Sequence, residues 1–284
     1  MKVQFYKNDT ESFLNDTHDI LLEHEAQNSI LISNAYRGKD SNYNTENWFC
    51  ATVKDDNGSV LASAMCTPPF NIIVYETGNK HDESTVNILA QELFDAGYIL
   101  PGITGEKVTS EIFAEYYSKL VQKNIRIHKN LNAMQLDNLS EIDFAPGYLR
   151  EITEEDLYYT PYWERGFIND CQLGDGDIIF IAEKHKSMVG QNVLYVWIDK
   201  NPVSMAGNVR SMTNGATIGR VYTPPFYRNK GYCTACVWHL SKIMLDQGNK
   251  FVSLYADADN PVSNKIYQKI GFGNVCLYQE IRFE

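Results

Sequence analysis

The stretch ATIGRVYTPPFYRNKGYC, residues 216–233, predicts a strand that passes through a Pro-rich turn into a helix. β-Branched and aromatic residues dominate its first part, and apolar residues at helical spacing follow Gly231 up to about residue 247. A loop between a strand and a helix N-terminus presents free backbone N–H groups and the positive end of the helix dipole, a combination that binds phosphate. Gly231 has no Cβ, so an anion can approach the backbone closely at this position.

The charge around this turn is opposite to that of the chain as a whole. The 284 residues carry a formal net charge of −11, but residues 220–250 contain one acidic residue, Asp246, against five basic ones: Arg220, Arg228, Lys230, Lys242 and Lys250. A diphosphate ligand fits this local excess of positive charge. The alternative is a solvated, charged turn in front of a surface helix, and spacing alone does not decide between the two.

A second strand–helix unit follows in LYADADNPVSNKIYQKIGF, residues 254–272. Asn260 is a typical helix N-cap, and Pro261 suits the first helical position. The helix should end at Gly271, and residues 275–283 predict a strand that closes the second half of the chain.

Together the two stretches resemble the GNAT family of acyl-CoA-dependent N-acetyltransferases. The phosphate loop of that family has the form Arg/Gln-x-x-Gly-x-Gly/Ala, and residues 228–233 occupy it here, with Cys233 where the family has Gly or Ala. The helix pattern Asn-Pro-x-Ser-Asn-x-x-Tyr-x-x-x-Gly-Phe, at 260–272, is the second specific match. The resemblance implies acetyl-CoA as co-substrate, an amine acceptor and no metal.

The resemblance also implies a role for each matched residue. Val221, Tyr222 and Thr223 would pair with the pantetheine amides as an added strand would. The loop that holds the pyrophosphate would consist of Arg228, Asn229, Lys230, Gly231, Tyr232, Cys233 and Thr234. Asn260 and Ser263 would line the thioester side. Tyr267 would donate a proton to the departing thiolate, since a phenol with a pKa near ~10 stays protonated at neutral pH.

The rest of the chain predicts a mixed α/β architecture. Strands are expected at 48–53, 60–65, 71–75, 99–105, 124–136, 194–198, from 203, and at 251–257, and helices at 11–26, 84–96, around 112–116, after Pro161 and at 177–189. The expected fold is that of a tandem GNAT protein with two lobes joined at 137–156. The first, 1–140, would be degenerate because it lacks the loop pattern, and the second, 150–284, would be catalytic.

Composition excludes several other classes of protein. The net charge of −11 disfavours binding to nucleic acid and to anionic membranes. No run of about 18 apolar residues predicts a membrane span. Six scattered cysteines, without a secretory signal, favour a reduced cytoplasm.

Four questions stay open at this stage. The general base could be Glu164, Asp257, Asp259 or a chain of water molecules. The aromatic run 158–167 around Glu164 could form a wall for a cationic or aromatic amine, or could serve domain packing. Cys233 and Cys236 form a C-x-x-C that suits core packing better than redox chemistry or metal binding. A non-catalytic acyl-CoA-binding module is the alternative to an acetyltransferase that transfers the acetyl group directly to a primary amine.

Overall fold

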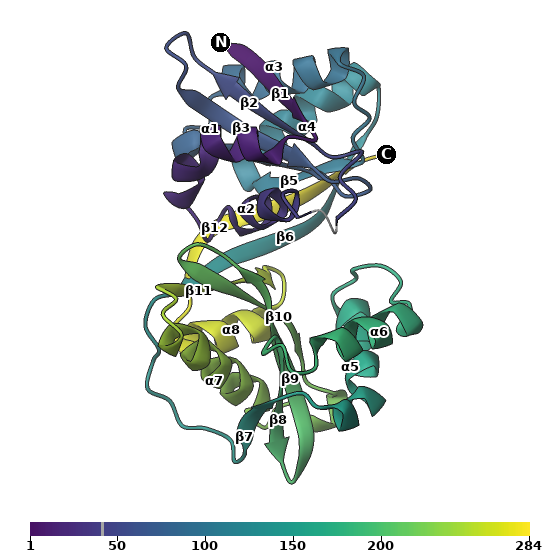
Figure 1. Cartoon of the computed structure of the whole chain (residues 1–284), viewed down its shortest axis with the longest axis vertical. Coiled ribbons are helices and arrows are strands. Elements are labelled where there is room, and N and C mark those ends of the chain that lie inside the picture. The colour runs from purple at the N-terminus through teal and green to yellow at the C-terminus, as the bar shows by residue number, and fades with distance from the viewer. Residues whose placement is uncertain (41–42) are drawn as a thin grey trace. The chain divides into compact units, whose positions relative to one another are not determined.

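The computed structural model describes residues 1–40 and 43–284, and its internal contacts divide the chain into two units. Unit 1 comprises residues 1–133 and 274–284, and unit 2 comprises residues 134–273. The same order of elements occurs twice along the chain: a strand, two helices, three strands, then helix, strand, helix and strand (Figure 1). The predicted mixed α/β fold with two lobes is confirmed.

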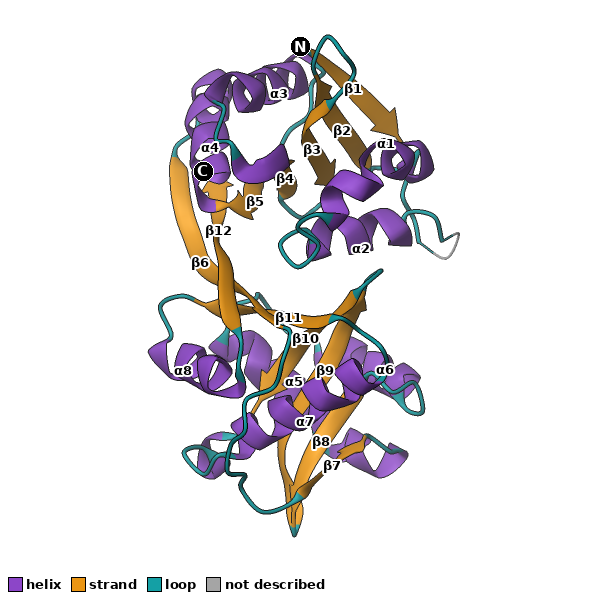
Figure 2. Cartoon of the chain, turned by 90° about the vertical axis from the view of Figure 1, so that its left-hand side faces the viewer, coloured by secondary structure: helices purple, strands orange, loops and turns teal. Residues whose placement is uncertain are grey.

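Unit 1 is a sheet covered by helices on both faces (Figure 2). Its strands, in the order in which they lie side by side, are β1 (Lys2–Lys7), β2 (Phe49–Lys54), β3 (Val60–Cys66), β4 (Ile72–Glu76), β5 (Gly102–Glu106), β12 (Gly273–Phe283) and the first part of β6 (Ile125–Leu136), up to residue 133. One face packs against α3 (Glu83–Asp95) and α4 (Lys107–Val121), and the other against α1 (Thr10–Leu22) and α2 (Ser29–Arg37). Strands β4 and β5 are parallel, with α3 as their crossover.

Unit 2 has the same three layers. Its sheet runs from the last residues of β6 (Ile125–Leu136) through β11 (Phe251–Asp257), β10 (Gly215–Tyr222), β9 (Asn201–Ser211), β8 (Leu194–Asp199) and β7 (Tyr148–Glu151). Helices α7 (Tyr232–Asp246) and α8 (Pro261–Ile270) cover one face, and α5 (Thr160–Asp170) and α6 (Ile178–Met188) belong to the other. Side chains of β8 point alternately to the two faces of the sheet. Trp197 belongs to the core under α7 and α8, whereas Val196 belongs to the core on the opposite face.

The C-terminal strand was expected to close the second half, and this part of the prediction is corrected. Residues 275–283 do form a strand, but β12 pairs antiparallel with β5, Tyr278 opposite Glu106, and so lies in unit 1. The Tyr278 hydroxyl donates to the carbonyl of Gln27 at 2.7 Å, and Ile281 and Phe283 join the core under α3 and α4. A strand's own alternation does not specify the strand with which it pairs.

Three elements have no counterpart in the sequence analysis: β1, α2 and β7. Strands β1 and β7 each lie at the edge of a sheet, where exposed polar residues weaken the alternation. β7 falls within 137–156, which was predicted to be a connection. Helix α2 is a nine-residue segment, shorter than the window in which helical periodicity is clear.

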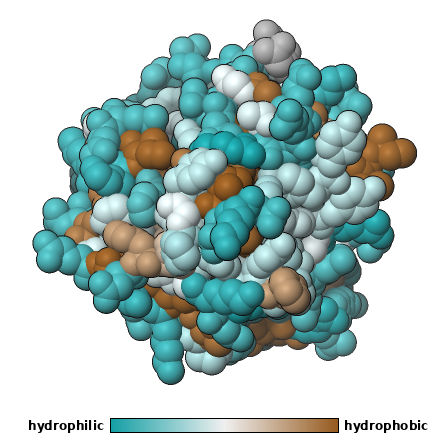
Figure 3. All heavy atoms as spheres, turned by 90° about the horizontal axis from the view of Figure 1, so that it is seen from below, coloured by the Kyte–Doolittle hydropathy of each residue, from teal (hydrophilic) through white to brown (hydrophobic). Residues whose placement is uncertain are grey.

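The surface is mixed in character. On the face drawn in Figure 3, hydrophobic residues are scattered among hydrophilic ones. In the part of the chain that the structure describes, none of the helices combines the length and the apolar composition needed to cross a membrane.

Candidate functional site in unit 2

Strands β10 and β11 separate halfway along their length. Their parallel pairing ends where Thr217 lies opposite Ser253, although β10 continues to Tyr222 and β11 to Asp257. A hydrogen bond between the two hydroxyl groups, 2.9 Å long, marks the last paired position. Beyond it, the edge of β10 that faces β11 offers its backbone groups to an extended ligand carrying amides, which can bind as an added strand does.

A bulge lies in the same part of β10. The register against β9 shifts between Gly219 and Tyr222, and Arg220 between them has a φ of +52°. Such a φ is uncommon for a residue with a Cβ and indicates a locally strained backbone. The bulge bends the end of β10, which then carries Val221, Tyr222 and Thr223 toward the loop.

The loop between β10 and α7 has the geometry of an anion site. Asn229 and Gly231 have φ values of +62° and +80°, and α7 begins at Tyr232 directly after Gly231. No side chain of the described residues caps this helix, so its first N–H groups remain available. A Cβ added at Gly231 would contact only the Ala145 Cβ, at 3.5 Å, so the space next to the loop is open. Successive N–H groups in left-handed turns form anion-binding concavities.

The two cationic side chains of the loop lie in different places. Arg228 Nε donates to the Thr223 carbonyl at 2.9 Å, and its Nη2 donates to Asp170 on α5 at 2.6 Å. Arg228 therefore ties the loop to the end of β10 and to α5. Lys230 is exposed and lies over the ring of Phe226 at 4.9 Å, so it keeps its positive charge in solvent beside the loop.

The first turn of α7 combines a polar contact with core packing. Tyr232 donates its hydroxyl proton to Asp199 at 2.5 Å, and Thr234 is buried. Burial raises the pKa of the Cys233 thiol to about 12, and it also raises the pKa of Cys236, which lies in the core. Redox motifs depend on a thiolate, so these two protonated thiols fit the interpretation as core residues. Among the described residues, no group of three or more His, Cys, Asp and Glu is placed to hold a metal ion.

Helix α8 begins as the sequence predicts. The Asn260 side-chain oxygen accepts hydrogen bonds from the backbone N–H groups of Val262 and Ser263, at 3.1 and 3.2 Å. The Ser263 hydroxyl in turn donates to the Asn260 carbonyl at 3.1 Å. Both side chains therefore stabilise the helix start, and their predicted contact with the thioester stays a prediction.

Tyr267 lies on α8 with its side chain turned into the core of unit 2. It is 8% exposed, and no group of the described residues forms a hydrogen bond with its hydroxyl. Burial raises its pKa well above the ordinary value of 10.0, and the neighbouring thiols, Cys233 first, act in the same direction. Tyr267 belongs to the same core as Cys236, and Cys233 packs against that core, so the structure brings Tyr267 together with the first turn of α7.

A buried ionic cluster on α5 and α6 was missed by sequence reasoning. Glu164 is 4% exposed, and its Oε2 lies 2.5 Å from His185 Nε2 and 3.0 Å from Arg220 Nε. Its Oε1 accepts a hydrogen bond from Lys184 Nζ at 3.1 Å. Burial acts to raise the pKa of Glu164, but the hydrogen bond with His185 and the charges of Arg220 and Lys184 outweigh it and lower the pKa to about 2.

This cluster bears on two of the open questions. A carboxylate with a pKa of about 2 is a weak base at neutral pH, so Glu164 is a poor candidate for the general base. Since its charge is already balanced, it is also a poor partner for a cationic amine. Asp257 and Asp259 are exposed, and the Asp257 carboxylate accepts the Asp259 N–H at 2.9 Å.

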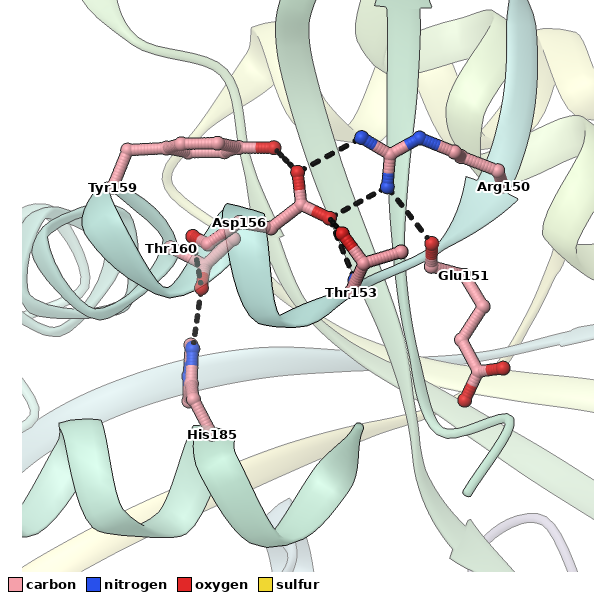
Figure 4. Close-up of polar contacts among 7 residues, drawn as sticks. All are labelled: Arg150, Glu151, Thr153, Asp156, Tyr159, Thr160 and His185. Atoms are coloured by element: carbon pink, nitrogen blue, oxygen red, sulfur yellow. Dashed lines mark hydrogen bonds and ion pairs between the residues drawn. The ribbon is translucent and has the colours of Figure 1, made fainter. Parts of the chain in front are cut away.

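A second cluster holds the start of α5 (Figure 4). Asp156 accepts two hydrogen bonds from Arg150, at 2.5 and 2.9 Å, one from the Tyr159 hydroxyl, and two from Thr153. The Thr160 hydroxyl lies 3.0 Å from His185 Nδ1, which links the two clusters. The pattern Thr-x-x-Asp at 153–156 is a capping box, a signal that the sequence does contain.

The two clusters predict that the fold becomes less stable in acid. The pKa values of Glu164 and Asp156 fall from 4.5 and 3.8 to about 2. A carboxyl group whose pKa is lower in the folded than in the unfolded protein stabilises the fold at every pH above its unfolded-state pKa. It loses that contribution as the pH falls toward its folded-state pKa. For Glu164 this contribution is about 3 kcal/mol. We expect the free energy of unfolding, measured in urea, to be steady above pH ~5 and to fall between pH ~4.5 and ~2.

Glu164→Gln tests the same point. It should lower the free energy of unfolding at pH 7 by about 3 kcal/mol, because it leaves Arg220 and Lys184 without a counter-charge. It should also reduce the further decrease of this free energy between pH ~4.5 and ~2. Glu155→Gln, at an exposed position beside Asp156, is the matched control and should change neither. Unaltered stability of the Glu164 variant at pH 7 would contradict the assignment.

The corresponding loop of unit 1, between β4 and α3, is filled by carboxylates of the chain itself. Glu76 is 2% exposed and accepts the backbone N–H groups of His81 and Asp82, at 2.5 and 2.9 Å. Asp82 caps α3 by accepting the Ser84 N–H at 3.0 Å. The donors that would hold a phosphate are therefore occupied.

Two parallel strands that separate beside an uncapped helix start, with helices on both faces of the sheet, define the acyl-CoA N-acyltransferase fold. Solved structures agree. A GCN5-related N-acetyltransferase from Sphaerobacter thermophilus has a TM-score of 0.66 at 11% identity, covering 99% of this chain and 95% of that one. A GNAT-family acetyltransferase from Colwellia psychrerythraea has a TM-score of 0.58 at 11% identity, and the match covers 100% of this chain and 99% of that one.

A tandem GNAT protein from the clavulanic acid biosynthesis pathway has a TM-score of 0.57 at 9% identity, covering 99% of this chain and 98% of that one. Such low identities show the fold alone. The model of the acetyltransferase (GNAT) family matches residues 136–272, whereas no curated protein sequence matches the chain. Residues 136–272 thus match the GNAT acetyltransferase family, and the resemblance stated from the motifs is confirmed.

Proposed function

We propose that the chain is an N-acetyltransferase that transfers an acetyl group from acetyl-CoA directly to a primary amine. The observation that carries the proposal is the unpaired end of β10, which continues through Asn229 and Gly231 into the uncapped start of α7. Backbone groups of the strand suit the pantetheine amides, and those of the loop suit the pyrophosphate. We place the reaction in unit 2, and we propose that unit 1 is the degenerate copy.

In the proposed reaction the neutral amine nitrogen attacks the thioester carbonyl carbon. The unpaired N–H groups of β10 beyond Thr217 are the donors available to stabilise the oxyanion. When the C–S bond breaks, Tyr267 donates its proton to the thiolate and is then reprotonated from solvent. The amine proton passes to water. The motifs place no nucleophile, so no covalent enzyme intermediate is expected.

The test is a titration with acetyl-CoA, followed by an assay of free thiol released in the presence of a panel of primary amines. Binding together with amine-dependent thiol release supports the proposal. Binding without turnover would favour the second candidate, a non-catalytic acyl-CoA-binding module. The observation that favours this candidate is the ionic pairing of Glu164, a buried carboxylate in contact with Arg220 of β10, because a paired carboxylate is a poor base.

We also expect one acetyl-CoA molecule to bind per chain. In unit 1, Glu76 and Asp82 occupy the N–H groups that a phosphate would need, and their negative charges would repel it. Isothermal titration calorimetry should give a stoichiometry of one. Two equivalent binding events per chain would contradict the assignment of unit 1 as degenerate.

A further inference from the structure

Arg220 occupies an unusual place in unit 2. It lies at the bulge of β10, with a φ of +52°, three residues beyond the last pair with β11. If the pyrophosphate lies on the loop and the pantetheine runs along β10 from Thr223 to Val221, the thioester end lies next to Arg220. The side chain of Arg220 points to the face that carries α5, because it contacts Glu164.

The guanidinium of Arg220 makes an ion pair but no hydrogen bond with Glu164. Its Nε lies 3.0 Å from Glu164 Oε2 without hydrogen-bond geometry, and the side chain is 15% exposed. Within the described residues, neither Nη atom has a hydrogen-bond partner. A strained backbone and a nearly buried cation with unpaired N–H donors both lower the stability of the fold. Such features concentrate at functional sites.

The ionic group that contains Arg220 carries a net positive charge. Glu164 supplies one negative charge, whereas Arg220 and Lys184 supply two positive charges, so the group is net positive even with His185 counted as neutral. His185 is fully buried and is held by the Thr160 hydroxyl on its other side (Figure 4). The carboxylate is therefore fixed in place and attracts the guanidinium by its charge, while the Nη fork is left for a ligand.

We propose that Arg220, with Lys184 beside it, binds a carboxylate of the acceptor, so that the acceptor is an amine bearing a carboxylate, as in an amino acid. This inference rests on the proposed acetyl transfer and names its substrate class. The planar fork of an arginine matches a carboxylate in bidentate geometry. Held there, the acceptor would have its amine near the thioester end of the cofactor.

The experiment compares matched pairs: free amino acids, their carboxamides, and the corresponding aminoalkylphosphonates. Calorimetry on the protein saturated with CoA should give a carboxylate affinity about 10- to 100-fold above that of the carboxamide. The same preference should appear in kcat/KM with acetyl-CoA. In Arg220→Gln the ratio of carboxylate to carboxamide affinity should fall to about one. In Arg220→Lys, which keeps the charge but not the planar fork, this ratio should lie between one and the value of the unaltered protein.

Arg165→Gln is the matched control, because it removes the same charge from an exposed position on the same helix as Glu164 and should leave the ratio unchanged. Equal affinity for carboxylate and carboxamide in the unaltered protein would overturn the inference, even if an Arg220 variant failed to fold. Tighter binding of the phosphonate would overturn the carboxylate assignment in favour of a phosphate-bearing amine. Absence of turnover with every amine would defeat the proposed acetyl transfer, while the affinities on the CoA complex would still decide the role of Arg220.

Discussion

Gly231→Val is expected to weaken acetyl-CoA binding by at least about 100-fold, a loss of about 3 kcal/mol. Gly231 has a φ of +80°, a conformation that a β-branched residue adopts only at a cost. A side chain there would also project into the open space beside the loop, where we place the pyrophosphate. Calorimetric titration with acetyl-CoA measures the effect directly.

Gly248→Val is the matched control for this change. Gly248 follows the opposite end of α7, has a φ of +96°, and has no atom within 4 Å of an added Cβ. Both variants should therefore lose similar stability, about 1–2 kcal/mol, but only the Gly231 variant should lose affinity. If Gly231→Val bound acetyl-CoA within about threefold of the unaltered protein, the loop would not be the phosphate site.

Tyr267→Phe is expected to lower kcat by about 10²- to 10⁴-fold, the usual contribution of a general acid. Because no group of the described residues forms a hydrogen bond with the hydroxyl, its removal should leave the melting temperature and the affinity for acetyl-CoA nearly unchanged. The raised pKa of the phenol also predicts that kcat shows no alkaline decline from this group below pH ~10. Steady-state kinetics across pH and thermal unfolding provide the measurements.

Tyr195→Phe is the control for Tyr267, since Tyr195 is a buried tyrosine of β8 in the same core. It should have little effect on kcat. If Tyr267→Phe kept its turnover within about threefold, a donor other than Tyr267 would have to protonate the thiolate, and the proposed acid role would be wrong.

The local elements of the site could be predicted because their signals are short-range. The helix expected from 231 to 247 is α7, Tyr232–Asp246, and the Asn260 cap is present with both of its hydrogen bonds. Glycine at a left-handed turn and Asn-Pro at a helix start act through their own backbone, so a few neighbouring residues contain the information. The same applies to the family motif, which consists of two such segments.

Other features depend on partners far away along the chain. Nothing near residue 275 indicates that β12 pairs with β5, and nothing near Arg228 indicates its ion pair with Asp170. The meeting of Glu164, His185 and Arg220 requires two helices and a bulged strand to pack against one another. Sequence pattern alone was thus sufficient for most of the helices and strands and for the loop, because local backbone preferences govern them. The pairing of β12 with β5 in unit 1 and the ionic group around Arg220 were decided only by the tertiary structure. Both depend on packing between distant segments and on desolvation, which local sequence does not specify.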